Sequence, residues 1–223
     1  MQLPDSFLAH TGPLLALDRP TQGLNSDVTL VVGARGRFIL KQATTADQVR
    51  TVATETQILA AICSHHPFVP APLASAPGLL LMTLLPGADL LALLPTLTPA
   101  DSHRLLAEAA VALRRIHTWT PASLAETPPA MLKRIRDAGL QPEITFCHGD
   151  YCVPNIMVAG GRVSGVIDWP YAGYLDRRID LASACKSIRW NFKEEVFVET
   201  FLRAYGYDGR DLGLFAELYD EFC

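Results

Sequence analysis

The sequence predicts an α+β fold in two lobes, a small β-rich N-terminal lobe and a mostly helical C-terminal lobe. Three observations carry this prediction. Apolar runs rich in β-branched residues, which are typical of strands, lie early in the chain, between residues 28 and 83. Segments with apolar residues at helical spacing lie late, and one short hairpin pattern, residues 155–167, stands among them. We therefore expect one lobe over residues 1–84 and a second over 85–223, with residues 84–87 as the connector.

Composition and charge exclude several classes of protein. The chain has 223 residues, of which 49% are hydrophobic and 19% charged, with a formal net charge of −4. This charge gives no basic footprint for nucleic acid. The longest apolar stretch, residues 78–95, is interrupted by proline, glycine and aspartate, so we expect no membrane span. The five cysteines form no CxxC pair and no signal peptide is recognisable, which favours reduced thiols and a cytoplasmic location.

The first lobe is expected to contain a hairpin and a helix that share an ion pair. Residues 28–32 (VTLVV) and 37–41 (RFILK) predict two strands around a turn at 33–36, with Lys41 at the end of the second strand. Residues 47–62 predict a helix in which Glu55 lies on the apolar face. Because a buried carboxylate without a partner is costly, this position calls for a cation, and we expect Lys41 to supply it.

The remaining elements are mostly helical. Residues 79–83 (LLLMT) predict a buried strand. Thr98 as a cap followed by Pro99 predicts the start of a helix that runs to residue 116. A short helix is expected over 131–138, ending at Gly139, and three more over 179–190, 194–205 and 211 to the end of the chain.

Residues 146–169, FCHGDYCVPNIMVAGGRVSGVIDW, carry the chemistry. We expect strands over 155–158 and 163–167 around a turn at 159–161. Residues equally far from such a turn lie opposite each other, with Cα atoms about 5 Å apart, so Asn155 and Asp168 should meet. Amide and carboxylate oxygens suit Mg²⁺, which takes one or two protein carboxylates together with substrate phosphates. Asp150 would then face an acceptor hydroxyl across the metal.

These residues resemble the set that protein kinases use for phosphoryl transfer. Asp150 would handle the hydroxyl, Asn155 and Asp168 would hold the metal, and Lys41, held by Glu55, would contact the phosphates. The alternative for the three residues of 146–169, each taken singly, is a set of capping and turn residues around a structural hairpin. We expect two further residues to be structural. His148 should brace the catalytic loop, and Asp180 should cap the following helix or brace the same loop.

The segments HGDYCVPN, GRVSGVID and DRRIDLA resemble those of the aminoglycoside 3'-phosphotransferase family, within the wider kinase-like phosphotransferases. LLLMTLLPGADLL, LRRIHT and LYDEFC extend the resemblance over most of the chain. It implies a bilobal protein-kinase-like fold, and an enzyme that uses ATP or GTP with Mg²⁺ to phosphorylate a hydroxyl of an antibiotic. The N-terminal lobe would bind the nucleotide, and the C-terminal lobe would hold the catalytic residues and the acceptor.

The resemblance also implies roles for residues outside the 146–169 segment. Ser26 would lie in the phosphate loop, and the backbone of Thr83 and Leu85 would contact the adenine. Near the end of the chain, Asp220 and Glu221 would attract the ammonium groups of a cationic acceptor, or would simply be a solvated helix end. We expect a small-molecule acceptor as the partner and a monomer or weak dimer as the assembly.

The chain departs from the family pattern in the region that selects the acceptor. The helical insert that usually precedes the HGD segment is reduced to a Pro-rich linker and residues 131–138. Tyr171 stands where an arginine is common, and Cys223 where an aromatic residue is common. Three alternatives to an aminoglycoside kinase therefore remain. They are a macrolide kinase, a kinase of choline, homoserine or an amino sugar, and a nucleotide-binding protein without transfer activity.

Overall fold

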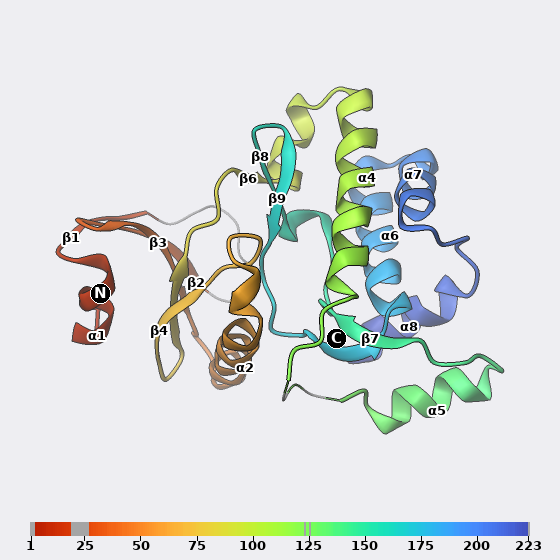
Figure 1. The fold of residues 1–223 in the computed structure, drawn as a ribbon, viewed down its shortest axis with the longest axis horizontal. Helices are drawn as coiled ribbons and strands as arrows, with labels where there is room; N and C mark the ends of the chain where they lie inside the picture. The colour runs from red at the N-terminus through yellow and green to blue at the C-terminus, as the bar shows by residue number, and fades with distance from the viewer. Residues whose placement is uncertain (1–2, 19–26, 123, 125, 223) are drawn as a thin grey trace. The chain divides into compact units, whose positions relative to one another are not determined.

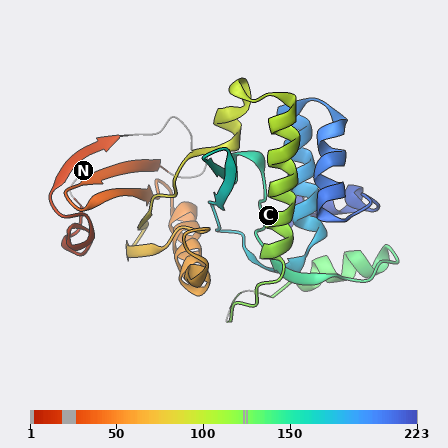
Figure 2. The same ribbon diagram turned by 45° about the horizontal axis from the view of Figure 1, so that its top comes forward.

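The computed structural model describes residues 3–18, 27–122, 124 and 126–222. The chain divides into two compact units, residues 1–85 and 86–223 (Figures 1 and 2). The division falls after Leu85, one residue beyond the expected connector start at Leu84. The larger sheet belongs to the first unit and the longer helices except one belong to the second, so the α+β class is confirmed. Among the described helices, none has both the length and the hydropathy that a membrane span needs.

The first unit is built on an antiparallel sheet of order β1-β2-β3-β5-β4. Its strands are β1 (Leu14–Asp18), β2 (Asp27–Gly33), β3 (Gly36–Gln42), β4 (Pro72–Ala76) and β5 (Leu79–Thr83). The predicted hairpin is β2–β3, which pairs Gly33 with Gly36 around a two-residue turn. The predicted strand over 79–83 is β5, whereas β1, β4 and the helix α1 (Asp5–Thr11) were not expected from the sequence.

Alternation along β3 places neighbouring side chains on opposite faces of this sheet. Leu40 packs with Leu81 and with Phe7 of α1 in a buried apolar cluster. Lys41 therefore points to the other face, where it contacts the helix α2 (Ala46–Ile62). α2 begins with a capping box between Thr45 and Gln48. As predicted, Glu55 lies on its buried face.

Helices dominate the second unit. α4 (Pro99–Ile116), α6 (Arg178–Phe192) and α7 (Glu195–Tyr205) lie side by side in both ribbon views (Figures 1 and 2). The hydroxyl of Thr98 accepts the amide of Asp101, which confirms the predicted start of α4. The other helices are α3 (Leu90–Leu93), α5 (Pro129–Asp137) and α8 (Leu212–Phe222).

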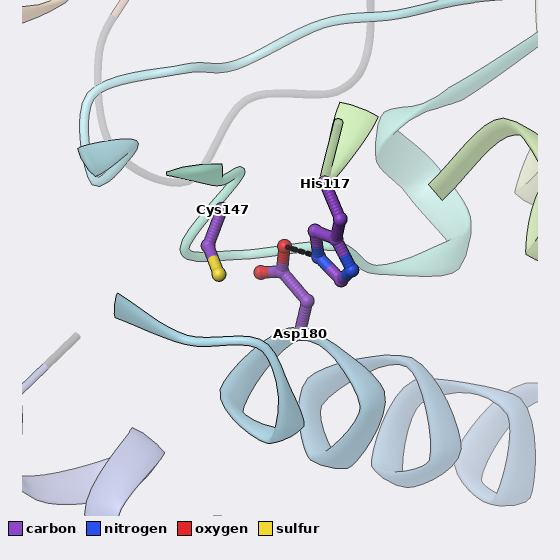
Figure 3. A group of neighbouring side chains, drawn as sticks. All are labelled: His117, Cys147 and Asp180. Carbon is purple, nitrogen blue, oxygen red and sulfur yellow. Dashed lines mark hydrogen bonds and ion pairs between the residues drawn. The ribbon is translucent and has the colours of Figure 1, made fainter. Parts of the chain in front are cut away.

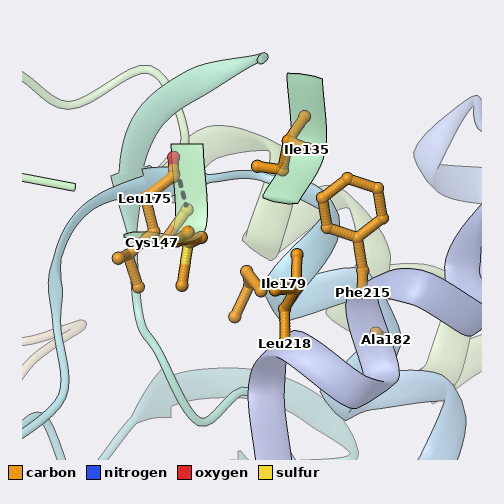
Figure 4. Packing of buried hydrophobic residues seen from close by; sticks show 8 residues of the cluster. Ile135, Cys147, Leu175, Ile179, Ala182, Phe215 and Leu218 are labelled. Atoms are coloured by element: carbon orange, nitrogen blue, oxygen red, sulfur yellow. Dashed lines mark hydrogen bonds between the residues drawn. The ribbon is translucent and has the colours of Figure 1, made fainter. Parts of the chain in front are cut away.

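Two small sheets complete the second unit. One contains β6 (Ala88–Asp89), β8 (Ile156–Ala159) and β9 (Arg162–Val166), and the other pairs β7 (Ile144–Cys147) with β10 (Gly173–Asp176). A buried cluster joins the β7–β10 pair to the helices α5, α6 and α8 (Figure 4). In it Cys147 and Leu175 pack with Ile179 of α6 and with Phe215 and Leu218 of α8. The strand that leads into the HGD segment thus shares one core with α6 and α8.

Candidate active site

The hairpin β8–β9 brings Asn155 and Asp168 to one end, as the sequence predicts. Ile156 pairs with Val166, and the amide of Ile167 donates to the carbonyl oxygen of Asn155 at 3.0 Å. Asp168 follows directly and has a positive φ of 67°, in the left-handed region that aspartate tolerates better than most residues. Asn155 ends a short 3₁₀ turn instead of beginning the strand. The two side chains therefore leave adjacent backbone positions.

Asp150 lies beside the same end of the hairpin. The side-chain Nδ2 of Asn155 donates to the carbonyl oxygen of Asp150 at 3.0 Å and approaches its Oδ2 at 3.4 Å. The other carboxylate oxygen, Oδ1, accepts the hydroxyl of Tyr219 at 2.7 Å and that of Ser183 at 3.4 Å. The structure thus brings together Asp150 and Asn155, which the sequence predicts as catalytic residue and metal ligand.

His148 connects the two ends of this site. The amide of Asp150 donates to its Nδ1 at 3.2 Å, so Nδ1 is the acceptor and the proton lies on Nε2. Nε2 then donates to the carbonyl oxygen of Ile167 at 3.1 Å, next to Asp168. The ring is fully buried. His148 is therefore a brace between the Asp150 loop and the Asp168 segment, as expected.

Asp180 holds the Asp150 loop from helix α6. Its carboxylate is fully buried and accepts the amides of His148 and Gly149, both at 2.8 Å. His117, which follows α4, contributes a third contact from Nε2 to Oδ2 at 3.0 Å (Figure 3). With its proton on Nε2, His117 can also accept the hydroxyl of Tyr205, 2.7 Å from Nδ1. Of the two roles expected for Asp180, the structure shows the loop brace.

The His117–Asp180 pair and Cys147 also form a compact group of potential metal ligands. Their ligand atoms lie within 4.8 Å of one another (Figure 3). The Asp180 oxygens, however, already accept three donors, and the Cys147 thiol is directed at the carbonyl oxygen of Leu175, 3.5 Å away (Figure 4). We therefore interpret this group as the hydrogen-bonded support of the loop that carries Asp150.

In the first unit, Lys41 and Glu55 form the ion pair that the sequence predicts. Nζ of Lys41 lies 2.8 Å from Oε1 and 2.7 Å from Oε2 of Glu55. The two side chains are 11% and 2% exposed, so the pair is largely shielded from water. Removing one partner from such a pair leaves a buried charge without compensation, at a cost of about 3–5 kcal/mol.

Three other residues are expected on the nucleotide side, and the structure describes two of them, Thr83 and Leu85. Ser26 lies outside the described residues. The amide of Thr83 donates to the carbonyl oxygen of Ala71 at 3.0 Å, so a contact from the backbone of Thr83 to adenine would have to use its carbonyl group. Leu85 is the last residue of the first unit and is buried.

Asp220 and Glu221 each lie next to a basic side chain. Asp220 is 2.5 Å from Nζ of Lys186, and Glu221 forms an ion pair with Arg134. Arg134 also lies 3.3 Å from Glu217. These exposed contacts connect α8 to α6 and α5, and contacts of this kind contribute about 0–1 kcal/mol each. An acceptor ammonium would therefore compete with a residue of the protein for these carboxylates.

Three residues of this site were missed by sequence reasoning: Tyr219 and Ser183, which contact Asp150, and His117, which contacts Asp180. The signal for Ser183 is helical spacing, since it lies three residues after Asp180 and so on the same face of α6. Tyr219 lies four residues after Phe215 and directly after Leu218, and it packs against the buried cluster to which both belong. Burial and the hydrogen bond to Asp150 raise the pKa of Tyr219 above its usual value, so the phenol remains a donor.

The donor set fits a magnesium ion. Nδ2 of Asn155 donates to the carbonyl oxygen of Asp150. The other end of the side-chain amide, the oxygen Oδ1, is therefore directed away from that carbonyl group. An amide oxygen and the Asp168 carboxylate are hard ligands of the type that Mg²⁺ prefers. Asn155 and Asp168 are thus the residues that would hold the ion.

Comparison with solved structures defines the class of fold. The structure of an aminoglycoside phosphotransferase APH(3'')-Id from Streptomyces rimosus, in complex with ADP and streptomycin, matches with a TM-score of 0.69 at 20% identity, over 97% of this chain and 96% of that one. A macrolide 2'-phosphotransferase from Brachybacterium faecium matches with a TM-score of 0.64 at 20% identity, over 96% and 85% of the two chains. At this identity the likeness establishes the kinase-like fold alone.

Sequence comparison then establishes the family. The profile of the phosphotransferase enzyme family, APH, matches residues 17–133 and 122–218, so the chain belongs to this family. An aminoglycoside 3'-phosphotransferase of Niallia circulans is 41% identical over 69 residues, which are 31% of this chain and 26% of that protein. Across five such relatives the aligned segment covers from 26% to 48% of the relative's length. The resemblance seen in the sequence is confirmed at the level of the family.

Proposed function

We propose that this protein transfers the γ-phosphoryl group of ATP to a hydroxyl group of a small molecule, with an aminoglycoside as the first candidate acceptor. The observation that carries the proposal is the arrangement of Asp150, Asn155 and Asp168 around one end of a hairpin, on a loop held by a buried carboxylate. Two further findings support it. Two relatives, from Niallia circulans and Streptomyces fradiae, are aminoglycoside 3'-phosphotransferases, and a protein of the same fold binds ADP and streptomycin.

Each residue has a defined task in this proposal. Asp150 orients the acceptor hydroxyl toward the phosphorus and accepts its proton late in the transfer. Lys41, oriented by Glu55, contacts the phosphates of the nucleotide. His148 and Asp180 fix the backbone on which Asp150 depends. Most of the rate enhancement would come from positioning and electrostatics, since the loose transition state needs little covalent help.

Asn155 and Asp168 would hold Mg²⁺, which when bound neutralises charge on the phosphate oxygens. We further propose a cytoplasmic location and a monomer or weak dimer. The described cysteines, Cys63, Cys147, Cys152 and Cys185, are not in disulfides, which suits a reducing compartment. GTP is the alternative phosphate donor.

A macrolide is the second candidate acceptor, because a macrolide 2'-phosphotransferase shares the fold. The shortened segment before HGD removes the part of the chain that would favour one of these acceptors over the other. Choline, homoserine and amino sugars remain further candidates. A nucleotide-binding protein without transfer is the alternative outside the enzymes, and the presence of Asp150, Lys41 and both metal ligands argues against it.

A screen of ADP release tests the proposal. The protein is incubated with Mg·ATP, or with Mg·GTP in parallel, and with aminoglycosides, macrolides, choline, homoserine and amino sugars in turn, and each product is checked by mass for one added phosphoryl group. We expect transfer to at least one acceptor, and its loss in Asp150→Ala with nucleotide binding retained. Binding of Mg·ATP without transfer to any acceptor would favour the nucleotide-binding alternative. Transfer that persists in Asp150→Ala would refute the proposed role of Asp150.

A further inference from the structure

The two oxygens of the Asp150 carboxylate have different surroundings. Oδ1 accepts a short hydrogen bond from Tyr219 at 2.7 Å and a long one from Ser183 at 3.4 Å. Oδ2 has the long contact of 3.4 Å with Asn155 Nδ2. The thiol of Cys152, a weak donor, also approaches this carboxylate. Because one carboxylate oxygen has about two acceptor sites, the hydroxyls of Tyr219 and Ser183 together saturate Oδ1.

Tyr219 is placed by a helix with several attachments. α8 contributes Phe215 and Leu218 to the core shared with α6 and β7 (Figure 4). Lys186 of α6 lies 5.6 Å from the centre of the Tyr219 ring, within the range of a cation–π contact, and it also pairs with Asp220. The phenol therefore reaches Asp150 from a packed element, not from a loop.

From these contacts we propose that Tyr219, assisted by Ser183, is a positioning residue that occupies Oδ1 of Asp150 and presents Oδ2 to the acceptor hydroxyl. A carboxylate on a single Cβ–Cγ bond can rotate, and either oxygen could then receive the acceptor. A charge-assisted hydrogen bond to one oxygen removes that freedom. The inference rests on the proposed role of Asp150, and adds which oxygen receives the proton and which residues select it.

Tyr219→Phe tests the inference, with Tyr207→Phe as the matched control. Tyr207 also loses a short phenol hydrogen bond on substitution, 2.6 Å to the carbonyl oxygen of Arg210, but it does not contact Asp150. With an acceptor found in the screen, we expect Tyr219→Phe to lower kcat about tenfold, the effect of one charge-assisted hydrogen bond. The KM values for ATP and acceptor should stay within about twofold, because ground-state binding is untouched.

Other kinetic outcomes would overturn the inference. An unchanged kcat in Tyr219→Phe would show that the phenol does not orient the carboxylate. A lower acceptor KM would show that Tyr219 competes with the acceptor for Asp150. An equal loss of kcat in Tyr207→Phe, or a loss that follows a lower melting temperature, would show a general effect on the fold.

Crystal structures of the wild type and of Tyr219→Phe provide a readout that does not need turnover. We expect the Asp150 carboxylate to rotate or to adopt two orientations in the variant, and to keep one orientation in Tyr207→Phe. A carboxylate that keeps its orientation without the phenol would overturn the inference even if the enzyme is active. If the wild type transfers phosphate to no acceptor while the carboxylate rotates in the variant, the proposed function fails and the positioning by Tyr219 stands.

Discussion

Oδ1 of Asp180 accepts the backbone amide of Gly149 at 2.8 Å, one residue before the proposed catalytic aspartate. The second oxygen accepts the preceding amide, that of His148, at the same distance. Two consecutive peptide groups of the loop are thus bound to one carboxylate of helix α6. Since that carboxylate is fully buried, the position of Asp150 depends on a residue that would not touch any substrate.

Asp180→Asn should therefore lower both stability and activity. The substituted amide keeps one acceptor oxygen but turns an NH₂ group toward a peptide N–H, so at least one buried donor loses its partner. We expect a loss of about 2–3 kcal/mol in the free energy of unfolding, measured in urea, together with a lower kcat. Asp208→Asn is the control, because Asp208 accepts an amide, that of Arg210, at an exposed position. If both variants unfold at the same urea concentration, the hydrogen bonds from the loop amides to Asp180 do not contribute to the free energy of unfolding.

Gly149→Ala should be more damaging than Gly139→Ala. Both glycines have positive φ, 86° and 75°, so alanine costs about 1–2 kcal/mol of backbone strain at either position. At Gly149 a Cβ would in addition lie 2.2 Å from the carbonyl oxygen of Tyr171, whereas at Gly139 it meets no atom within 4 Å. We expect an extra loss of at least about 1–3 kcal/mol for Gly149→Ala in urea unfolding. Equal losses would mean that the loop can move away from Tyr171.

Glu55→Gln should destabilise the first unit and impair nucleotide use. The substitution removes the carboxylate charge that lies 2.7 Å from the ammonium of Lys41, which is itself largely buried. We expect a loss of about 3 kcal/mol in the free energy of unfolding and a higher KM for ATP. The matched control is Asp47→Asn on the same helix, where Asp47 pairs with Arg50 at the surface and should contribute less than about 1 kcal/mol. An unchanged KM for ATP would separate the ion pair from nucleotide binding.

Glu221→Gln should raise the KM for a cationic acceptor and leave that for an uncharged acceptor unchanged. The reason is the loss of a negative charge near the acceptor, on the order of 1 kcal/mol when screened by water. Arg134→Gln provides the control, because it breaks the same ion pair while keeping the carboxylate. If the two variants change KM alike, then Glu221 acts only by tying α8 to α5.

Thiol alkylation should distinguish the cysteines of the described chain. Burial raises the pKa of the Cys185 thiol from 9.0 to about 12. The pKa of the Cys152 thiol is raised more than that of Cys185, mainly by burial and secondly by the negative charge of Asp150. The raised pKa of Cys185 stabilises the folded state below pH 9, and this contribution is lost as the pH rises toward 12. At pH 8 we expect iodoacetamide to modify the exposed Cys63 well before either of them, as read by peptide mapping. Early modification of Cys152 would show that the Asp150 loop opens.

Local patterns in the sequence were sufficient for the parts of the site that depend on neighbouring residues. The hairpin register follows from a turn and two short apolar runs, so the approach of Asn155 to Asp168 could be predicted. The Lys41–Glu55 pair followed from a strand end and one charged residue on an apolar helix face. Both arguments use periodicity, which a single sequence contains.

The contacts that bind distant segments could not be read in the same way. Tyr219 is 69 residues from Asp150, and His117 is 63 from Asp180. Their meeting is decided by the packing of α8 on α6, and of both α4 and α6 on α7, for which the sequence provides only apolar faces. Strands β1 and β4 were missed because neither carries a run of β-branched residues. The ion pairs of Asp220 and Glu221 were missed because surface charges have no periodic signature.

The hydrogen bond from Tyr219 of α8 to Asp150 affects how truncated copies of this gene should be interpreted. A premature stop codon before residue 212 would leave HGDYCVPN and GRVSGVID intact, and a motif search would score the product as complete. The truncated protein would nevertheless lack the Tyr219 phenol that donates to Oδ1 of Asp150. It would also lack Phe215 and Leu218, which pack with Cys147 of β7, the strand before the HGD segment. Variants of this gene that lose α8 should accordingly be classed as impaired, whatever their motifs suggest.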